Sequence, residues 1–367
     1  MALYIGLMSG TSLDGLDGVL AGFDGAAPTV QAHRYRPFDD QLRAELVALN
    51  GAHGPHELHR SALAANALAE AGAALVADVL QAAAVRASDV RAVGSHGVTL
   101  RHRPGEFDAS GGYTVQIDNP ALLAQRSGID VVADFRRRDV AAGGQGAPLV
   151  PAFHAAMFGR AGVAQAVLNL GGFANLTLLH ADGRVTGFDC GPANVLLDAW
   201  HARHCGSAFD DGGRWAASGR VVPALLATLR AEPYFHRPPP KSTGRDLFNL
   251  GWLEAKLSDQ APQDVQATLA ELTARSIAAD LQAHAPATRR LLACGGGARN
   301  TQVMARLAAL LPQVQVGSTA EAGLPVDQVE ATAFAWLAHR HMERLPGNLP
   351  AVTGARHACV LGALYPA

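Results

Sequence analysis

The stretch LYIGLMSGTS, residues 3–12, carries the clearest indication of the fold, because an apolar run ends abruptly in glycine and small hydroxyl residues. A second apolar run, residues 18–23, follows at once, which predicts a strand, a Gly/Ser turn and another strand. The same pattern returns in AQAVLNLGGFANLTLL, residues 164–179, with its turn at 171–175. Two copies of one strand–turn–strand unit predict a duplicated α/β architecture, with two lobes and a cleft between them.

Further elements are expected after each copy. Apolar runs and alternation predict strands, and apolar residues at helical spacing predict helices. The expected strands are 30–35, 90–95, 113–117, 129–132, 184–188 and 289–294, and the expected helices are 39–49, 56–85, 120–127, 192–204, 221–230, 250–257, 265–285, 301–311 and 327–344. The segment AAGGQGAP, 141–148, breaks the pattern. We therefore expect an N-terminal lobe of residues 1–140, completed by 355–367, and a C-terminal lobe of residues 141–354.

Composition excludes several classes of protein. With 49% hydrophobic and 17% charged residues in 367, the chain is expected to be globular throughout. A net charge of −2 argues against a broad nucleic-acid-binding face, which needs clustered positive charge. The longest apolar stretch, 61–85, is interrupted by Asn66, Glu70 and Asp78, so we expect a packed helix that is too polar to span a membrane.

The sequence also lacks the marks of export and of several common active sites. The N-terminus has no basic segment, since the first cation is Arg34, and none of the four cysteines forms a CxxC pair. These features predict a cytoplasmic protein. No Gly-Lys pair occurs, which excludes a P-loop, and no GxSxG occurs, which argues against an α/β-hydrolase.

The first candidate site is the turn GTSLDGLD, residues 10–17. Glycine N–H groups and hydroxyl groups at a strand turn are suitable donors to a phosphate. Asp14 and Asp17 would repel that phosphate unless a cation such as Mg²⁺ lay between them. The alternative is an ordinary hairpin turn with solvated carboxylates.

Two more glycine turns have a related pattern. NLGGFAN, residues 169–175, occupies the corresponding place in the second copy, so the two hairpins are candidates to hold a triphosphate. CGGGARN, residues 294–300, leads from a strand into a helix, whose N-terminus favours an anion. Asp189 also ends a strand just before a predicted helix, where an N-cap is the simpler interpretation.

The remaining polar segments have both a functional and a structural interpretation. SHGVTLRHRP, residues 95–104, offers several donors to a polar substrate, whereas DFRRRD, 134–139, is also typical of a solvated basic loop. PPPKSTGR, residues 238–245, contains Lys241 and favours a stiff structural loop over a site.

Six of these segments together resemble the 1,6-anhydro-N-acetylmuramic acid kinases. They are MSGTSLDG (8–15), ADFR (133–136), GGQGAPLVP (143–151), NLGG (169–172), DCGPAN (189–194) and PKSTGR (240–245), in order along the chain. The resemblance implies a two-lobed actin-like ATPase (ribonuclease H-like) fold, with duplicated mixed β-sheet domains and an interlobe cleft. It also implies ATP and Mg²⁺ as cofactors.

The implied reaction has two parts. Water opens the 1,6-anhydro ring while the γ-phosphate goes to O6, giving N-acetylmuramic acid 6-phosphate and ADP in the recycling of cell-wall amino sugars. The implied partner is one small anhydro amino sugar, in a cytoplasmic protein. Net charge and composition argue against nucleic-acid and membrane partners, and a homodimer is one candidate oligomeric state, which the sequence does not fix.

The resemblance assigns roles to particular residues. Asp189 becomes the catalytic base, which replaces the N-cap interpretation, and Glu330 is expected as a second carboxylate near the water. Asp14 is expected to hold the metal. The sugar is expected at His96, Gln116, Arg136 and Asn194, and ATP at Gly10, Thr11, Ser12, Leu13, Asp14, Gly15, Leu16, Asp17, Gly171, Gly172, Asn175, Gly295, Gly296 and Gly297.

The chain departs from the family pattern at three places. Cys190 stands where Thr is more common, Val98 where Gln is, and Asp118-Asn119 where Gly-Asp is. The first departure is expected to remove a hydrogen bond near the base, and the other two to change contacts with the sugar.

Two rival functions fit the same fold. An ordinary sugar or acid kinase would use the carboxylate to deprotonate a free hydroxyl rather than water. An ATP-driven clamp of the chaperone type would need an added client-binding domain, for which the sequence offers no segment.

Overall fold

The structure is a computed structural model that describes residues 2–10, 13–24, 28–51, 54–106 and 112–367. Thr11 and Ser12, both predicted to bind ATP, lie outside the described residues. The chain divides into two compact units. Unit 1 comprises Met1–Met157 and Gln328–Ala367, and unit 2 comprises Phe158–Asp327.

These bounds differ from the predicted lobes, since residues 141–157 and 328–354 belong to unit 1. The loop that contains Gln145 is bonded to the C-terminal segment, as the Gln145 N–H donates to the Thr353 carbonyl at 2.7 Å. The last long helix, α12 (Val329–Met342), packs on the sheet of unit 1. Local sequence patterns identify this helix but do not say which sheet it covers.

Unit 1 is built on a six-stranded sheet of order β13-β7-β4-β1-β2-β3. Its strands are β1 (Leu3–Met8), β2 (Gly15–Gly22), β3 (Thr29–Pro37), β4 (Val90–Ser95), β7 (Val131–Ala133) and β13 (Ala363–Tyr365). β1 pairs with β2 antiparallel and with β4 parallel, and β4 pairs with β7 parallel. A separate two-stranded sheet holds β5 (Val98–Arg103) and β6 (Tyr113–Ile117).

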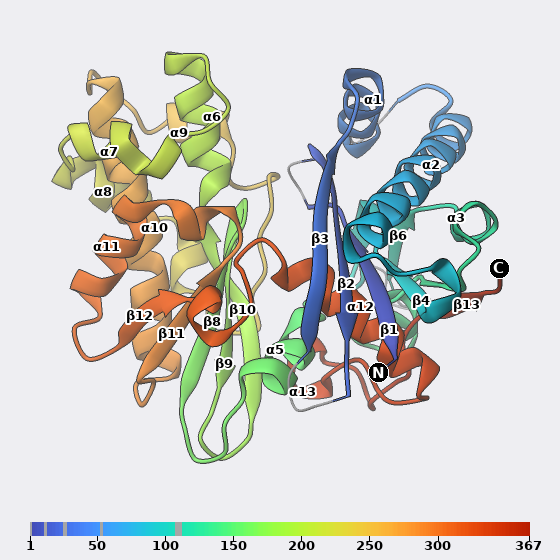
Figure 1. Ribbon diagram of the computed structural model, residues 1–367. Coiled ribbons are helices and arrows are strands. Elements are labelled where there is room, and N and C mark those ends of the chain that lie inside the picture. The colour runs from blue at the N-terminus through green and yellow to red at the C-terminus, as the bar shows by residue number, and fades with distance from the viewer. Residues whose placement is uncertain (1, 11–12, 25–27, 52–53, 107–111) are drawn as a thin grey trace. The chain divides into compact units, whose positions relative to one another are not determined.

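Unit 2 repeats the central part of this arrangement in a five-stranded sheet of order β10-β9-β8-β11-β12 (Figure 1). Its strands are β8 (Gln165–Leu170), β9 (Phe173–Leu179), β10 (Val185–Pro192), β11 (Arg290–Cys294) and β12 (Gln315–Ser318). The first strand again has an antiparallel hairpin on one side and two parallel strands on the other. The predicted α/β class with duplicated mixed sheets is therefore confirmed.

Helices cover both sheets. In unit 1 they are α1 (Asp40–Asn50), α2 (Glu57–Ala83), α3 (Pro120–Ser127), α4 (Arg137–Ala141), α12 and α13 (Pro350–Thr353), with α5 (Val150–Phe158) at the boundary. In unit 2 they are α6 (Asn194–Cys205), α7 (Arg214–Ser218), α8 (Pro223–Arg230), α9 (Leu250–Glu254), α10 (Pro262–His284) and α11 (Thr301–Leu310). Short 3₁₀ turns are η1 (Ala87–Asp89), η2 (Asp211–Gly213), η3 (Pro233–His236), η4 (Gly296–Arg299) and η5 (Thr319–Ala322).

Helix α2 is the packed helix expected from the alanine-rich stretch. Its length and composition alone would let it cross a membrane, so the prediction that it is too polar for this was wrong. Leu68, Leu75 and Val79 are nevertheless buried in the core of unit 1. A helix that buries such a face within a folded unit is typical of a globular core.

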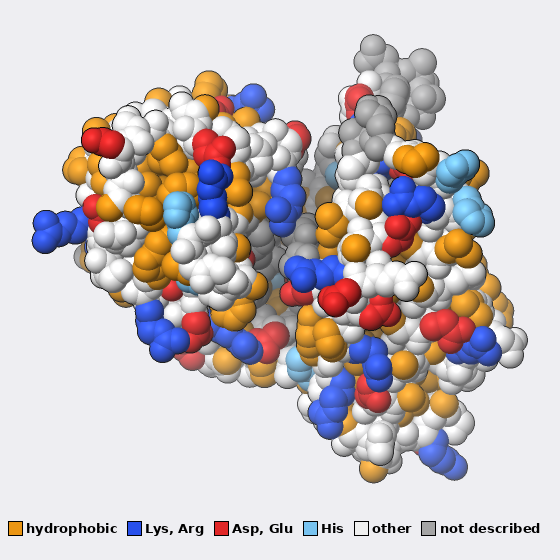
Figure 2. Space-filling model, turned by 90° about the horizontal axis from the view of Figure 1, so that it is seen from above, with side chains coloured by type: hydrophobic (Ala, Val, Ile, Leu, Met, Phe, Trp, Pro, Cys, Tyr) orange, Lys and Arg blue, Asp and Glu red, His pale blue; other side chains and the backbone are white. Residues whose placement is uncertain are grey.

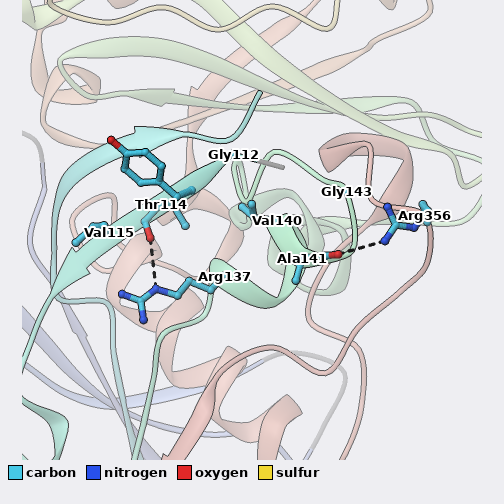
Figure 3. Close-up of a pocket in the computed structure, with 9 residues that line it drawn as sticks. Gly112, Thr114, Val115, Arg137, Val140, Ala141, Gly143 and Arg356 are labelled. Atoms are coloured by element: carbon cyan, nitrogen blue, oxygen red, sulfur yellow. Dashed lines mark hydrogen bonds between the residues drawn. The ribbon is translucent and has the colours of Figure 1, made fainter. Parts of the chain in front are cut away.

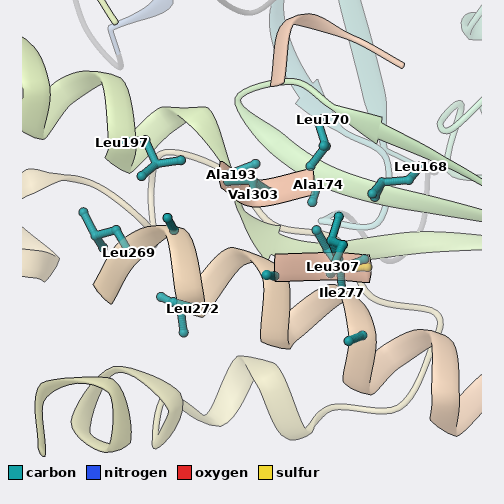
Figure 4. Packing of buried hydrophobic residues seen from close by; sticks show 14 of the residues in the cluster. Leu168, Leu170, Ala174, Ala193, Leu197, Leu269, Leu272, Ile277, Val303 and Leu307 are labelled. Carbon is teal, nitrogen blue, oxygen red and sulfur yellow. The ribbon is translucent and has the colours of Figure 1, made fainter. Parts of the chain in front are cut away.

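Unit 2 has a continuous apolar core between its sheet and helix α10. Figure 4 shows Leu168 and Leu170 of β8 above Ile277 of α10 and Leu307 of α11. On the face seen in Figure 2, positive and negative side chains are interspersed rather than gathered by sign, as the net charge of −2 leads one to expect.

Candidate active site

Several of the predicted site residues follow the carboxyl ends of the parallel strands of their unit. In unit 2, Gly171 follows β8 directly and Gly295 follows β11. In unit 1, Ser9 follows β1 and His96 follows β4, and the His96 N–H donates to the Leu7 carbonyl at 3.1 Å. This edge of an α/β sheet is where ligands usually bind.

Three loops of unit 2 interlock through their backbones. The Ala193 and Asn194 N–H groups donate to the carbonyls of Gly172 and Gly171 at 3.0 and 3.1 Å, and the Asn194 side-chain amide donates to the Leu170 carbonyl at 3.1 Å. Asn194 was expected to bind the sugar, but it lies among the residues expected to bind ATP.

Gly295 brings the third loop against the first. Its φ of +78° is in the region that favours glycine, and a Cβ there would lie 3.0 Å from the Leu170 carbonyl oxygen and would overlap the side chain of Asn169. The following glycines, Gly296 and Gly297, begin the 3₁₀ turn η4, which precedes α11. Exposed backbone N–H groups near a helix start are suited to phosphate oxygens.

A row of polar side chains crosses the sheet of unit 2 near this edge. Asn169, Asn175 and Asp189 are register partners on β8, β9 and β10. Register partners of antiparallel strands project from the same face. The next residues along, Leu168, Leu176 and Phe188, are all buried in the core. Asp189 and Asn175 therefore share the face opposite to the core.

Asp189 is held firmly by its neighbours. Its Oδ2 accepts a hydrogen bond from the Thr243 N–H at 3.1 Å, its N–H donates to the Lys241 carbonyl at 3.1 Å, and its own carbonyl accepts from the Tyr234 hydroxyl at 2.8 Å. Burial raises the pKa of Asp189 from 3.8 to about 6, although the Thr243 N–H and the charge of Lys241 lower it. The carboxyl is thus ionised at neutral pH and basic enough to take a proton.

The N-cap interpretation of Asp189 does not hold. Helix α6 begins at Asn194 with Ala193 as its N-cap, so Asp189 lies on β10 several residues before the helix.

The first glycine turn in unit 1 offers mainly backbone groups. The Leu13 N–H donates to the Gly10 carbonyl at 3.2 Å, and the side chains of Leu13 and Leu16 are buried in the core. Asp17 lies within β2, where its Oδ1 is 2.8 Å from His33 Nε2. Asp14 is exposed at the turn.

A single carboxylate at this turn fits a magnesium ion. Mg²⁺ in nucleotide sites is usually held by one or two carboxylates together with phosphates and water. No group of three or more His, Cys, Asp or Glu side chains among the described residues forms a metal cage. Asp14 therefore fits an ion that arrives with the nucleotide.

Arg136 and His96 form the polar centre of unit 1. Arg136 donates to His96 Nε2 through Nε at 3.2 Å and Nη2 at 2.9 Å, and to the Gly146 carbonyl through Nη1 at 2.9 Å. Burial lowers the pKa of Arg136 to about 10, partly offset by the charges of Glu330 and Asp139, so Arg136 stays positive. Burial and the charge of Arg136 lower the pKa of His96, which is therefore neutral at pH 7.

Glu330 and the glycine loop belong to the same polar region. Glu330 lies in the first turn of α12, where a carboxylate is stabilised by the helix dipole. Asp139 accepts hydrogen bonds from the Gly146 N–H at 2.7 Å, the Asn348 amide at 2.6 Å and the Thr353 hydroxyl at 2.7 Å. Asp139 thereby fixes the loop that meets Arg136, a role that no local sequence pattern indicates.

Gln116 lies on β6, where its amide nitrogen donates to the hydroxyls of Thr99 and Thr114 at 3.1 and 2.8 Å. Its buried Oε1 has no hydrogen-bond partner among the described residues. Nearby, the Ser95 hydroxyl donates to Asp118 at 2.5 Å, and burial raises the pKa of Asp118 to about 6.

A cavity of about 730 Å³ lies in unit 1 beside these residues (Figure 3). Arg137 and Arg356 lie on its wall, held by hydrogen bonds to the carbonyls of Thr114 and Ala141 at 3.4 and 3.2 Å. Its lining includes Val115 and Arg137 but neither Gln116 nor Arg136.

Sequence reasoning missed the groups behind Asp189. Lys241 was placed in a structural loop, and Tyr234 and Asp280 were not singled out. Lys241 and Lys256 are the only lysines in the chain, and only Lys241 lies between a run of prolines and the sequence STG. This position is the sequence feature that could have indicated a special role for Lys241.

Comparisons with known proteins identify the family of the chain. The family model described as anhydro-N-acetylmuramic acid kinase matches residues 2–367. An anhydro-N-acetylmuramic acid kinase from Cupriavidus pinatubonensis is 57% identical over 99% of this chain and 98% of its own length. Another from Bordetella petrii is 59% identical over 100% of this chain and 96% of its own.

Solved structures resemble the chain less closely. An activator of the 2-hydroxyisocaproyl-CoA dehydratase from Clostridium difficile has a TM-score of 0.46 and 11% identity, covering 93% of this chain and 96% of its own. A ROK family glucokinase from Streptomyces griseus has a TM-score of 0.40 and 17% identity, covering 91% and 99%.

The family match over nearly the whole chain and the high identity to full-length relatives point to the same conclusion as the motifs. The chain belongs to the anhydro-N-acetylmuramic acid kinase family, and it is a phosphotransferase.

Proposed function

We propose that the protein adds water to 1,6-anhydro-N-acetylmuramic acid and phosphorylates O6, giving N-acetylmuramic acid 6-phosphate and ADP. The water oxygen bonds to C1 as the C1–O6 bond breaks, and O6 takes the γ-phosphoryl group of ATP. The observation that carries the proposal is Asp189, a fixed carboxylate beside three interlocked glycine loops, with its pKa raised by burial to about 6.

Asp189 acts as the general base in this proposal. Its carboxylate takes a proton from the water that attacks C1, which typically contributes about 10²–10⁴-fold to the rate. Since the carboxyl must be ionised, turnover is expected to fall about tenfold per pH unit below pH 6 and to level off above it. Glu330 is assigned to a second contact with the water.

The glycine turns are assigned to ATP. In unit 2 the assigned residues are Gly171, Gly172, Asn175 and Gly295–Gly297. In unit 1 they are the residues of the turn 10–17, in which Asp14 is assigned to the metal ion. Backbone N–H groups at such turns bind phosphate oxygens without adding charge. When bound, Mg²⁺ would neutralise charge that develops on the phosphates.

His96, Gln116 and Arg136 are assigned to the sugar. A guanidinium carries five N–H donors, and Arg136 uses only some of them in its hydrogen bonds to His96 and Gly146. The others are available to a sugar oxygen. The buried Gln116 Oε1 supplies an acceptor for a sugar hydroxyl. Asn194 is assigned to the nucleotide side of the site, because it is bonded to the glycine loop.

The test is product analysis with ATP, Mg²⁺ and the anhydro sugar in ¹⁸O-labelled water. Ring opening places one label on C1 of the phosphorylated product, whereas an ordinary kinase would give an unlabelled product with its anhydro ring intact. Hydrolysis of ATP at the same rate without sugar would instead favour a clamp-like ATPase. Either of these results would overturn the proposal.

The role of Asp189 is tested separately by Asp189→Asn, with Asp182→Asn as the control. Asp182 is an exposed carboxylate of the same unit that pairs with Arg184. We expect Asp189→Asn to lose 10²–10⁴-fold in turnover and Asp182→Asn to behave like the wild type. Near-normal turnover by Asp189→Asn would remove Asp189 from the mechanism.

We also place the protein in the cytoplasm, as a homodimer without nucleic-acid or membrane partners. None of the four cysteines, all of which the structure describes, forms a disulfide, which fits a reducing compartment. Light scattering of the purified protein tests the dimer by its mass.

A further inference from the structure

A buried ion pair lies behind Asp189 in unit 2. Lys241 Nζ is 2.9 Å from Asp280 Oδ1, and each residue is only 7% exposed. Lys241 lies in the loop before α9, and Asp280 lies near the end of α10. A buried ion pair often stabilises a fold no better than apolar residues of the same size.

The loop that contains Lys241 holds Asp189 at two points. The Lys241 carbonyl accepts from the Asp189 N–H at 3.1 Å, and the Thr243 N–H donates to Asp189 Oδ2, also at 3.1 Å. One tripeptide, residues 241–243, thus fixes both the backbone and the side chain of Asp189. Any movement of this tripeptide would reorient the carboxylate.

The Lys241 side chain is enclosed by aromatic rings as well as by Asp280. Its Nζ lies 5.7 Å from the centre of the Phe188 ring and 5.4 Å from that of Tyr234. An ammonium group over an aromatic face is attracted by the ring. Tyr234 also donates to the Asp189 carbonyl, so the walls around Lys241 are built from the residues that hold Asp189.

We propose that Lys241 and Asp280 are a positioning pair, which fixes the tripeptide 241–243 on β10 and so sets the orientation and charge state of the Asp189 carboxylate. This inference rests on the proposed role of Asp189 as the base. Neither residue is a catalytic residue, because each acts through Asp189.

The charges around Asp189 support this assignment. Burial raises its pKa to about 6, and the Thr243 N–H and the charge of Lys241 lower it. The other titratable groups that face this region are Cys190, Tyr234 and Asp280, with Arg237 acting on Tyr234 and His284 on Asp280. Burial raises the pKa of both the Cys190 thiol and the Tyr234 hydroxyl, so both are neutral at pH 7. Among the described residues, Lys241 is the charged side chain that lowers the pKa of Asp189 and so favours its ionised form.

The experiment replaces both charges together, since Lys241→Met alone would leave Asp280 buried without its partner. In Lys241→Met/Asp280→Asn, we expect kcat to fall 10- to 100-fold while KM for ATP stays within twofold. We also expect the acid limb of the kcat profile to move to higher pH, because the carboxylate loses the positive charge that lowers its pKa, whereas the Asp280 charge that is removed with it is not among the causes of that pKa shift.

A second ion pair on the same helix provides the matched control. Glu271 of α10 pairs with Arg306 through contacts of 2.6 and 3.0 Å and is likewise buried. Glu271→Gln/Arg306→Met should lower the melting temperature with no shift of the acid limb. If the Lys241/Asp280 variant does only the same, the pair is purely structural and the inference is wrong.

Asp189→Asn separates this failure from failure of the proposed function. If Asp189→Asn is inactive and the Lys241/Asp280 variant keeps its acid limb near pH 6, only the positioning role of Lys241 and Asp280 is wrong. If Asp189→Asn turns over normally, the assignment of the base falls, and the positioning role falls with it.

Discussion

The two sheets share one strand order, but the helices reach them in different ways. In unit 1, Gly6 and Gly94 are register partners on β1 and β4, and a Cβ on either would overlap a backbone carbonyl of α12, that of Ala331 or of Phe334. In unit 2 the partners at the corresponding places on β8 and β11 are Leu168 and Ala293. The backbone of α12 thus touches the sheet of unit 1 directly, whereas side chains fill the core of unit 2.

The polar residues at the strand ends differ as well. Unit 1 places a cation, Arg136, against a neutral histidine, whereas unit 2 places a carboxylate, Asp189, in front of a buried ion pair. In the proposed function, the same sheet arrangement supplies donors to the sugar in one unit and the base in the other. The repeated sheet arrangement therefore determines where polar residues collect, whereas the identity of single residues determines which chemistry they can perform.

The largest expected effect tests the close contact in unit 1. Gly94→Ala should destabilise the protein by about 3 kcal/mol or more, because backbone rather than a movable side chain stands in the way. The reverse change in unit 2, Ala293→Gly, should cost only about 1 kcal/mol. Thermal melting of the two variants measures the difference.

The control for this prediction is Gly105→Ala. A Cβ at Gly105 would meet only a side-chain nitrogen of Gln145, at 3.9 Å, so its melting temperature should stay near that of the wild type. If Gly94→Ala melted like Gly105→Ala, the two units would not differ in the way that we describe.

Much of this organisation could be predicted from the sequence, because it depends on local patterns. The two strand–glycine–strand units and the position of Asp189 at a strand end are visible in residues 3–23 and 164–189. The packing of α12 on the sheet of unit 1 was not predicted. The residues of α12 that contact Gly6 and Gly94 lie more than 230 residues away from these glycines in the chain, so no local pattern connects them.

Pairings between distant segments were also beyond the sequence. Lys241 and Asp280 meet only because the loop before α9 folds across β10. The edge strand β13, only three residues long, carries too short a pattern to be recognised.

A smaller effect tests the donor role of unit 1. Arg136→Met removes a charged donor to His96 and the Gly146 carbonyl, and with it the proposed contact to the sugar. Hydrogen bonds to charged groups contribute about 1.5–3 kcal/mol. We therefore expect KM for the anhydro sugar to rise about 10- to 100-fold, with KM for ATP little changed.

The neighbouring residue is a matched control for Arg136. Arg137 is exposed and was not assigned to the sugar, so Arg137→Met should leave KM for the sugar unchanged. Equal effects of the two substitutions would show that the sugar does not depend on Arg136 in particular, and the division of roles between the units would be wrong.

The smallest expected effect concerns Asp118, the unit 1 carboxyl that burial affects in the same direction as Asp189. Burial raises its pKa from 3.8 to about 6, so the folded state binds this proton more tightly than the unfolded state. The contribution of Asp118 to stability is therefore fully present below pH 4, is lost as the pH rises through 6, and stays absent at neutral pH. Asp118→Asn removes this loss, whose ceiling is roughly 3 kcal/mol. The asparagine side chain must still accept the hydrogen bond from the Ser95 hydroxyl, which reduces the expected gain in stability to about 1 kcal/mol.

Melting curves at pH 4 and pH 8 measure this gain, which should be present at pH 8 and absent at pH 4. Asp89→Asn is the opposite control, because Asp89 is exposed and its hydrogen bond from Arg86 lowers its pKa. Asp118→Asn should also keep its turnover, whereas Asp189→Asn should lose it. If Asp118→Asn and Asp189→Asn reduced turnover equally, each unit would contain a buried carboxyl that the reaction needs. The assignment of the base to unit 2 alone would then be wrong.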